Sequence, residues 1–267
     1  WLLIRTDEQS LQGPAARLSE ITSDQITDDV DTLLSYFSRV SRQPEEATNC
    51  GYDSGAYEWK IDGSGYPLIY VEPLEAFVHL FPVTKPQFEK FIAAVRPQGL
   101  GDEWYTKILS LNPRASYRSQ NILVRERLFM TGITTDEAIS FGRWLGRDYT
   151  LLSAEEWRIC YEWFAEKPAP SIPLELAEGL ARDALALWNI VAGQWLEERQ
   201  PPNLQELSLM TQGILEWVIE HAGRYCGLGE PSTSKSQRKA SDPVRPLGPE
   251  PRRLKNLGFR LRTRLRS

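Results

Sequence analysis

The sequence is poor in the residues that hold metal ions and close disulfides. Its 267 residues include three cysteines and two histidines. Cys50, Cys160 and Cys226 stand far apart, so no pair has the short spacing of a structural zinc site or a redox motif. We therefore expect neither a disulfide framework nor a metal site. The sequence also has no Gly-rich phosphate loop, GxSxG nucleophile elbow or HExxH zinc motif.

Long apolar runs are missing too. No stretch of about eighteen apolar residues occurs, so no membrane-spanning helix is expected. The short apolar run Trp1–Ile4 lacks the basic region of a secretory leader. We expect a cytoplasmic protein without a membrane partner, and a fragment of a longer protein or a removed leader is the alternative. With 41% hydrophobic and 10% aromatic residues, the chain can fill the core of one large domain.

Charge is distributed unevenly along the chain. The net charge is -5, yet residues 235–267 hold eleven basic and two acidic side chains, which is +9 for that segment and -14 for the rest. Such asymmetry indicates pairing between the two parts of the chain or binding of an acidic partner. Nucleic-acid contact is an alternative, although few aromatic residues stand among these arginines to stack on bases.

The pattern of the first half predicts an extension followed by a domain. Residues 23–40 have the period of an amphipathic helix with an acidic start, and residues 41–53 have the composition of a linker. We place an acidic helical extension at 1–48 and a domain at 49–267. That domain begins with strands at 57–61, 67–71 and 77–81, the first two joined by a Gly-rich turn at 62–65, and with a helix after Thr84.

Two further helices have clear start signals. One begins at Thr134 or Thr135 and runs through Trp144, with Ala138, Phe141, Trp144 and Leu145 on its predicted buried face. Another begins at Ser153, where a capping box with Glu156 precedes a helix that turns Trp157 and Cys160 inward. Residues 174–198 predict a long helical stretch, which we treat as an insertion at about 168–202. A Ser- and Lys-rich loop is expected at 231–239.

Five ordered segments resemble the formylglycine-generating enzyme (sulfatase-modifying factor) family. The family's "EVTNxQYxxF", "VSWxDAxAYCxWLG", "RLPTEAEWE", "DMxGNVWEWV" and "NLGFR" are similar to 81–91, 133–146, 151–157, 210–218 and 256–260. The resemblance implies an irregular α+β fold of the C-type-lectin-like type. It also implies structural roles for six residues, Trp144, Trp157, Trp217, Gly258, Phe259 and Arg260.

Catalysis in this family uses two nearby cysteines that hold copper between the "WEWV" and "NLGFR" segments. Here that region, residues 219–255, contains Cys226 alone. Cys226 is a weak catalytic candidate, because one thiolate cannot form the Cu(I) site. His221 precedes Cys226 in a loose metal-like cluster, and a solvated loop histidine is the alternative. We predict no catalytic metal and no cofactor, although the resemblance allows a structural calcium ion.

A scaffold that lacks the catalytic pair suggests a pseudoenzyme. We expect a non-catalytic recognition or scaffold domain that binds a protein partner within a larger, bacterial assembly. The alternative is a divergent formylglycine-generating-type oxidase that acts on a protein cysteine.

Alternating arginines near the chain end are the predicted partner surface. Arg260, Arg262, Arg264 and Arg266 alternate with apolar residues and Thr263, which is the period of a half-buried strand. We expect this row to face the acidic residues of helix 23–40 or an acidic partner. The predicted partner-binding residues are Arg252, Arg253, Arg262 and Arg264.

Overall fold

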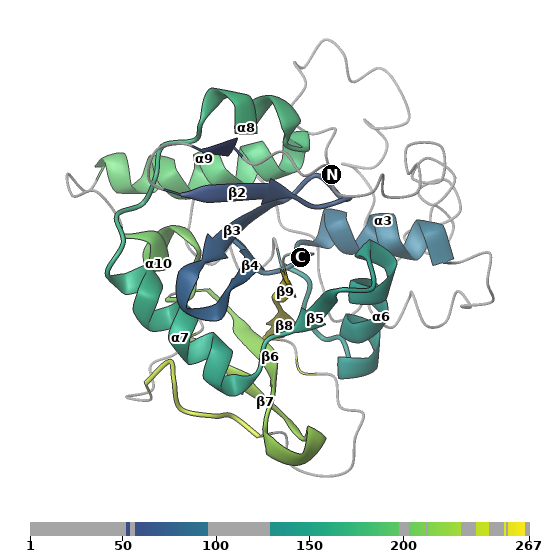
Figure 1. Ribbon diagram of the computed structural model, residues 1–267. Helices are drawn as coiled ribbons and strands as arrows, with labels where there is room; N and C mark the ends of the chain where they lie inside the picture. Colours follow the sequence, from purple (N-terminus) through teal and green to yellow (C-terminus); the bar gives the residue numbers. More distant parts are fainter. Residues whose placement is uncertain are drawn as a thin grey trace.

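The computed structural model describes residues 52–53, 57–95, 129–197, 203–211, 213–230, 239–245, 254 and 256–264. The predicted acidic extension at 1–48 and residues 231–238 of the predicted loop lie outside this part of the chain. The fold is a mixed α+β arrangement with two sheets and several helices (Figure 1).

The predicted strands around the Gly-rich turn form the first antiparallel ladder. Strand β2 (Glu58–Ile61) pairs with β3 (Pro67–Val71), and β3 pairs with β4 (Ala76–His79). The turn itself is closed by a bond from the Gly65 N–H to the Asp62 carbonyl. Gly65 has φ +86°, a conformation that suits glycine because it has no Cβ.

A strand from the C-terminal part of the sequence, β9 (Leu261–Arg264), pairs with β4 and extends this sheet. Six strands lie in the order β1-β2-β3-β4-β9-β5, with β1 at Tyr52–Asp53 and β5 at Tyr149–Leu151. A second sheet has the order β7-β6-β8, with β6 at Leu215–Ile219, β7 at Tyr225–Leu228 and β8 at Leu257–Phe259. Strands β6 and β8 are parallel.

The predicted arginine-bearing strand therefore divides between two sheets. Only Arg260 separates β8 from β9, and its neighbours in sequence pair with different strands. The alternation of apolar residues and arginines nevertheless continues from β8 into β9. Leu257, Phe259 and Leu261 enter one hydrophobic cluster, and Arg260 and Arg262 face carboxylates on the opposite side.

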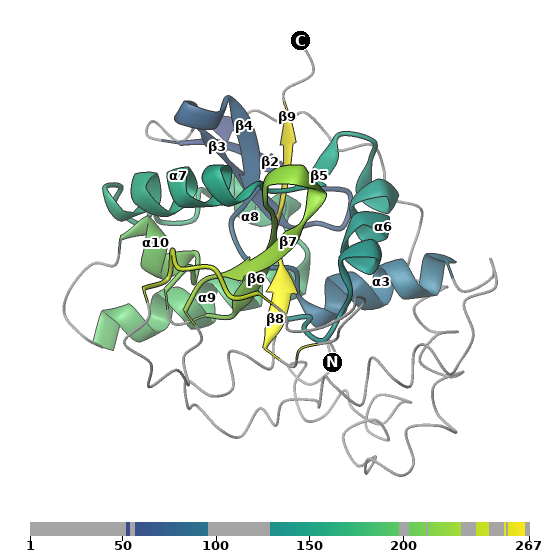
Figure 2. The same ribbon diagram turned by 90° about the horizontal axis from the view of Figure 1, so that it is seen from below.

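Helices cover both faces of the six-stranded sheet. Helices α3 (Lys85–Val95) and α6 (Thr135–Leu145) pack on the face that presents Leu68, Phe77 and Leu261. The opposite face carries α7 (Ala154–Ala165), α8 (Leu174–Gly179), α9 (Arg182–Glu197) and α10 (Leu204–Leu207). Figures 1 and 2 show the sheet between these two groups.

Capping boxes begin three of these helices. In α6, Thr134 caps the N–H of Glu137 and the Glu137 carboxylate accepts from the N–H of Thr134. Ser153 and Glu156 do the same for α7, as their spacing predicts. Asn203 and Glu206 form a third box at α10, which we did not predict although the sequence carries its signal.

The predicted helical insertion is part of the core. It forms two helices, because the chain leaves helical geometry at Leu180 and Ala181 to contact the β2–β3 turn. There the Ala181 N–H donates to the Gly65 carbonyl at 2.8 Å. A Cβ on Gly65 would lie 2.7 Å from that of Ala181, so the close approach requires glycine. The insertion contributes Leu176, Ala184, Trp188 and Val191 to the larger hydrophobic cluster.

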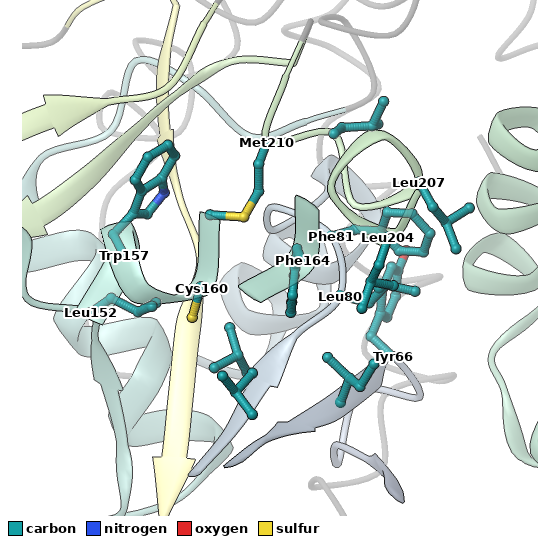
Figure 3. Close-up of a cluster of buried hydrophobic side chains, with 14 of the residues drawn as sticks. Tyr66, Leu80, Phe81, Leu152, Trp157, Cys160, Phe164, Leu204, Leu207 and Met210 are labelled. Carbon is teal, nitrogen blue, oxygen red and sulfur yellow. The ribbon is translucent and has the colours of Figure 1, made fainter. Parts of the chain in front are cut away.

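The two tryptophans expected at the centre are buried. Trp157 of α7 is 0% exposed and Trp217 of β6 is 2% exposed. Figure 3 shows Trp157 and Cys160 on one face of α7, near Met210 and Phe164. Trp144, which we placed on the buried face of α6, is only half buried and packs at the edge of the second cluster.

A polar cluster lies within the helix-covered sheet. The Asp62 Oδ1 atom accepts from the Ser64 hydroxyl and the N–H groups of Ser64 and Tyr66, and Oδ2 lies 2.8 Å from His79 Nε2. Both Asp62 and His79 are buried. Gln87 of α3 donates to Asp62 and to Ser64, and so ties the helix to the turn.

Among the described residues, no helix combines the length and apolar character needed to cross a membrane.

Candidate functional site

The two adjacent elements that form the site are the start of α7 and the end of β6. The Ile219 N–H donates to the Leu152 carbonyl at 3.0 Å, and Ser153 forms a parallel bridge with Ile219. The backbone of β6 is thereby held against the first turn of α7. The capping box fixes where that helix begins, and so fixes the position of the side chains on its first two turns.

A tight reversal after β6 forms the opposite wall. The chain passes through the short 3₁₀ helix η4 (His221–Gly223) and returns as β7. The Glu220 N–H donates to the Arg224 carbonyl at 2.7 Å, and Gly223 adopts φ +72°. Figures 1 and 2 show this reversal beside α7. It presents His221 and Arg224 outward, since both are exposed.

Between these walls lies a cavity of about 260 Å³ that opens to the surface. It is lined by residues from α7, from the reversal and from the segment after β7. Its basic lining residues are Arg158, His221, Arg224 and Arg245, its acidic ones are Glu155 and Glu220, and Ser153, Ala154 and Ile219 complete it. We call this the basic cavity.

Glu220 and Arg245 form the main ion pair of the basic cavity. Arg245 Nη2 lies 2.8 Å from Glu220 Oε1, and Nε lies 3.1 Å from Oε2. The hydrogen bond from Arg245 is the largest cause that lowers the pKa of Glu220. The two partners differ in exposure, since the Arg245 side chain is 63% exposed and that of Glu220 is 14% exposed. Glu220 is therefore a partly buried anion paired with a largely exposed arginine.

The other two arginines keep hydrogen-bonding capacity. Arg158 Nη2 donates to the Ser241 carbonyl at 3.3 Å, which uses one of its five N–H groups. Arg224 forms no ion pair with another residue in the described part of the chain, although its charge helps to lower the pKa of Glu220. The basic cavity therefore offers guanidinium donors that the described residues do not saturate.

Cys226, the weak catalytic candidate, lies beside this cavity and not in it. Its side chain is buried in β7 and its thiol donates to the Glu220 carboxylate. Burial, followed by the charge of Glu220, raises the pKa of Cys226 to about 11. Burial likewise raises the pKa of Cys160. Both thiols are protonated at neutral pH, which is the opposite of what an activated cysteine requires.

Most of the residues singled out by the family resemblance meet in one place. Arg260 is fully buried and its guanidinium pairs with Glu216 of β6. Glu216 also accepts from the Trp157 indole at 3.1 Å. The Trp217 indole donates to the Ile133 carbonyl, and Phe259 pairs with Trp217 across the second sheet. Gly258 is required there, since a Cβ would lie 2.4 Å from the Met130 carbonyl oxygen.

The predicted partner-binding arginines do not form a single described row. Arg252 and Arg253 lie outside the described residues. Arg262 Nε lies 2.9 Å from Glu156 Oε1 of α7, so the carboxylate it faces belongs to the domain itself. Arg264 is exposed. Whether helix 23–40 approaches this face stays a prediction, because that helix lies outside the described residues.

Sequence reasoning missed the basic cavity. Arg158 and Arg224 have no distinctive spacing, and Arg245 enters only as one residue in a basic segment. The available signal was the reversal at 220–224, where a glutamate, a histidine, a glycine and an arginine follow a strand closely. No group of three His, Cys, Asp or Glu residues suited to a metal ion occurs among the residues that the structure describes.

Searches against models of known protein families, curated proteins and solved structures return no match for this chain.

Proposed function

We propose that this chain is a non-catalytic recognition domain of the formylglycine-generating-enzyme-like type, with a C-type-lectin-like fold, that binds a protein partner in a larger bacterial assembly. The observation that carries the proposal is the basic cavity. It combines guanidinium donors that the described residues leave unsaturated with walls that backbone hydrogen bonds tie to secondary structure.

The contacts among the five family-like segments support this type of scaffold. The Val83 N–H donates to the Phe259 carbonyl, and the Trp217 indole donates to the Ile133 carbonyl. Glu216 bonds both Trp157 and Arg260. Each segment thus contacts another through a specific hydrogen bond. Segments distant in sequence but mutually bonded in space are the arrangement expected if their similarity to the family reflects a common fold.

The state of the thiols favours recognition over oxidase chemistry. Formation of a Cu(I)–thiolate bond requires a deprotonated sulfur, and burial opposes deprotonation of both Cys160 and Cys226. The oxidase alternative is tested by incubating the protein with Cu(I) and a cysteine-containing peptide. Aldehyde formation that disappears in Cys226→Ser would overturn the proposal.

Partner binding is tested by cross-linking the full chain in extracts of its native host. We expect a reproducible partner whose cross-links map to α7 and to residues 219–225. The variant Arg158→Glu/Arg224→Glu should lose that partner. The matched control is Arg143→Glu/Arg182→Glu, which reverses two exposed arginines away from the basic cavity. A partner that survives the cavity variant, or is lost equally in the control, would refute the role of this face.

A further inference from the structure

We infer that the basic cavity binds a carboxylate carried by an acidic segment of a protein partner. This inference rests on the proposed function and names the chemistry of the partner. It is independent of the family resemblance, because it derives from the lining residues and their charges alone.

The size of the cavity limits the ligand. Its volume of about 260 Å³ falls below the range of roughly 300 to 1,000 Å³ typical of sites that enclose a drug-sized molecule. A single acidic side chain or a chain terminus is of suitable size. A nucleotide would project beyond the cavity and would need additional contacts.

The balance of charge favours capture of one carboxylate in the cavity. Among the described lining residues, three arginines and two glutamates sum to one net positive charge, with the histidine left out of the sum. Arginine forks bind carboxylates in two-point geometry. No Phe, Tyr or Trp stands among the described lining residues for bases to stack on, so this lining favours a peptide carboxylate over nucleic acid.

The α7 backbone adds to the attraction. Ala154 and Glu155 occupy the first turn of this twelve-residue helix and line the cavity. N–H groups in a first turn have no intrahelical acceptor, and the helix dipole makes that end positive. An anion held by Arg158 and Arg224 would lie in that field.

Glu220 already occupies part of the binding capacity as an internal carboxylate. It engages two N–H groups of Arg245 and the Cys226 thiol. An incoming carboxylate therefore competes with Glu220 for Arg245 and is repelled by its charge. Replacing Glu220 with the neutral, isosteric glutamine should strengthen binding. A peptide bound to a face remote from Glu220 would show no such gain.

The experiment measures binding of a fluorescein-labelled hexaglutamate peptide to the full chain by fluorescence anisotropy at about 50 mM and 150 mM salt. We expect Arg224→Gln to weaken binding about three- to fivefold, as for loss of one partly exposed charge contact. Glu220→Gln should strengthen it by a similar factor. Arg143→Gln is the matched control and should change nothing. Binding should weaken at the higher salt, because screening acts on exposed charges.

Additional probes separate the sources of binding. A hexaglutamine peptide should not bind. Amidation of the hexaglutamate C-terminus distinguishes side-chain capture, which it leaves intact, from capture of the terminal carboxylate, which it abolishes. A single-stranded DNA of six phosphates should bind more weakly than hexaglutamate, and tighter DNA binding would overturn the inference. Arg224 lies on an exposed reversal, so its variant should fold, and thermal unfolding verifies this.

The outcomes distinguish this inference from the proposed function. If Glu220→Gln fails to strengthen binding, or Arg224→Gln leaves it unchanged, the carboxylate site is wrong. If a partner is still cross-linked to α7 and residues 219–225, and is lost in the double charge-reversal variant, the recognition function stands with a different ligand chemistry. Failure of both experiments would refute both.

Discussion

Arg260 and Glu216 are joined by two hydrogen bonds, from Arg260 Nε to Glu216 Oε2 at 3.0 Å and from Nη2 to Oε1 at 2.9 Å. Both side chains are buried. The remaining N–H groups of Arg260 reach the carbonyls of His79, Leu80 and Ser208. A buried charge is tolerated only when it is fully paired in this way. The pair connects the junction of β8 and β9 to the second sheet and to the end of β4.

Replacing Glu216 with Gln should destabilise the protein strongly. The guanidinium of Arg260 would remain buried without its counter-charge, and breaking a buried pair costs about 3–5 kcal/mol. Urea unfolding should show this loss in the free energy of unfolding. The matched control is Glu162→Gln on the exposed side of α7, which should change stability by less than about 0.5 kcal/mol. Similar curves for both variants would contradict the structural role of the pair.

Truncating Trp157 separates packing from hydrogen bonding. Trp157→Ala removes a fully buried ring and should cost about 3–5 kcal/mol of stability. Trp157→Phe keeps an aromatic ring but loses the indole donor to Glu216, so a smaller loss of about 1–3 kcal/mol is expected. Trp163→Phe, at a half-buried position of the same helix, is the control. Equal losses for Ala and Phe at position 157 would argue against packing as the main term.

Because the pKa of Asp62 is lowered in the folded state, we expect the protein to lose stability in acid. Burial acts to raise the pKa of Asp62, but hydrogen bonds from His79, Ser64 and the Tyr66 N–H outweigh it, and the pKa is lowered in the folded state. The stabilisation is therefore present above the unfolded pKa of about 3.9 and is lost as the pH falls through the folded pKa. Other titratable groups near this cluster include Lys90, which donates to the Ser64 carbonyl, as well as Tyr66, Asp183 and Tyr149.

The measurement compares unfolding of wild type and Asp62→Asn between about pH 2 and pH 7. Wild type should be more stable by about 1–3 kcal/mol above pH 5, as for a buried acceptor that loses its charge. The difference should shrink towards pH 2. Glu58→Gln, at an exposed position of β2, should show no such trend. A pH-independent difference would show that the effect of Asp62 is steric.

Charge reversal at Arg262 should destabilise the protein more than charge reversal at Arg264, although both residues belong to β9. The Arg262 side chain is 15% exposed and faces Glu156, whose other oxygen caps α7. Arg262→Glu would place two carboxylates together at the start of that helix and should lower stability by roughly 1 kcal/mol or more at low salt. Arg264→Glu should have little effect on stability. Parallel thermal unfolding of both variants at low and high salt checks this, and equal losses would contradict the pairing with Glu156.

Local interactions explain which elements could be predicted from the sequence. The capping boxes at Thr134 and Ser153 involve groups three residues apart, and the turn at 62–65 is closed within four residues. Interactions of this short range can be recognised from residue types a few positions apart in the sequence. The burial of Trp157 and Trp217 follows similarly from large apolar rings at inward positions of a helix and a strand.

The features that the sequence did not predict depend on contacts between segments distant in the sequence. The alternation of 257–264 indicated that one face would carry arginines, but not that the segment would divide between two sheets or that Glu156 would face Arg262. Where α8 and α9 separate, the Ala181 N–H bonds to the Gly65 carbonyl, a partner more than a hundred residues away in the sequence. We interpreted 174–198 as one helical stretch, although Gly179, where α8 ends, is a possible stop signal in the sequence.

By itself, the sequence determined the mixed α+β composition, the helix starts and the inward placement of the aromatic residues, because each depends on periodicity or on bonds within one turn. Tertiary structure alone decided the partner of Arg260, which lies 44 residues from Glu216, and the assembly of the basic cavity from Arg158, Arg224 and Arg245. The reason is physical. An arginine has no preferred position in a short sequence pattern, and its environment depends on which carboxylates and carbonyls the packing of sheets and helices brings within reach.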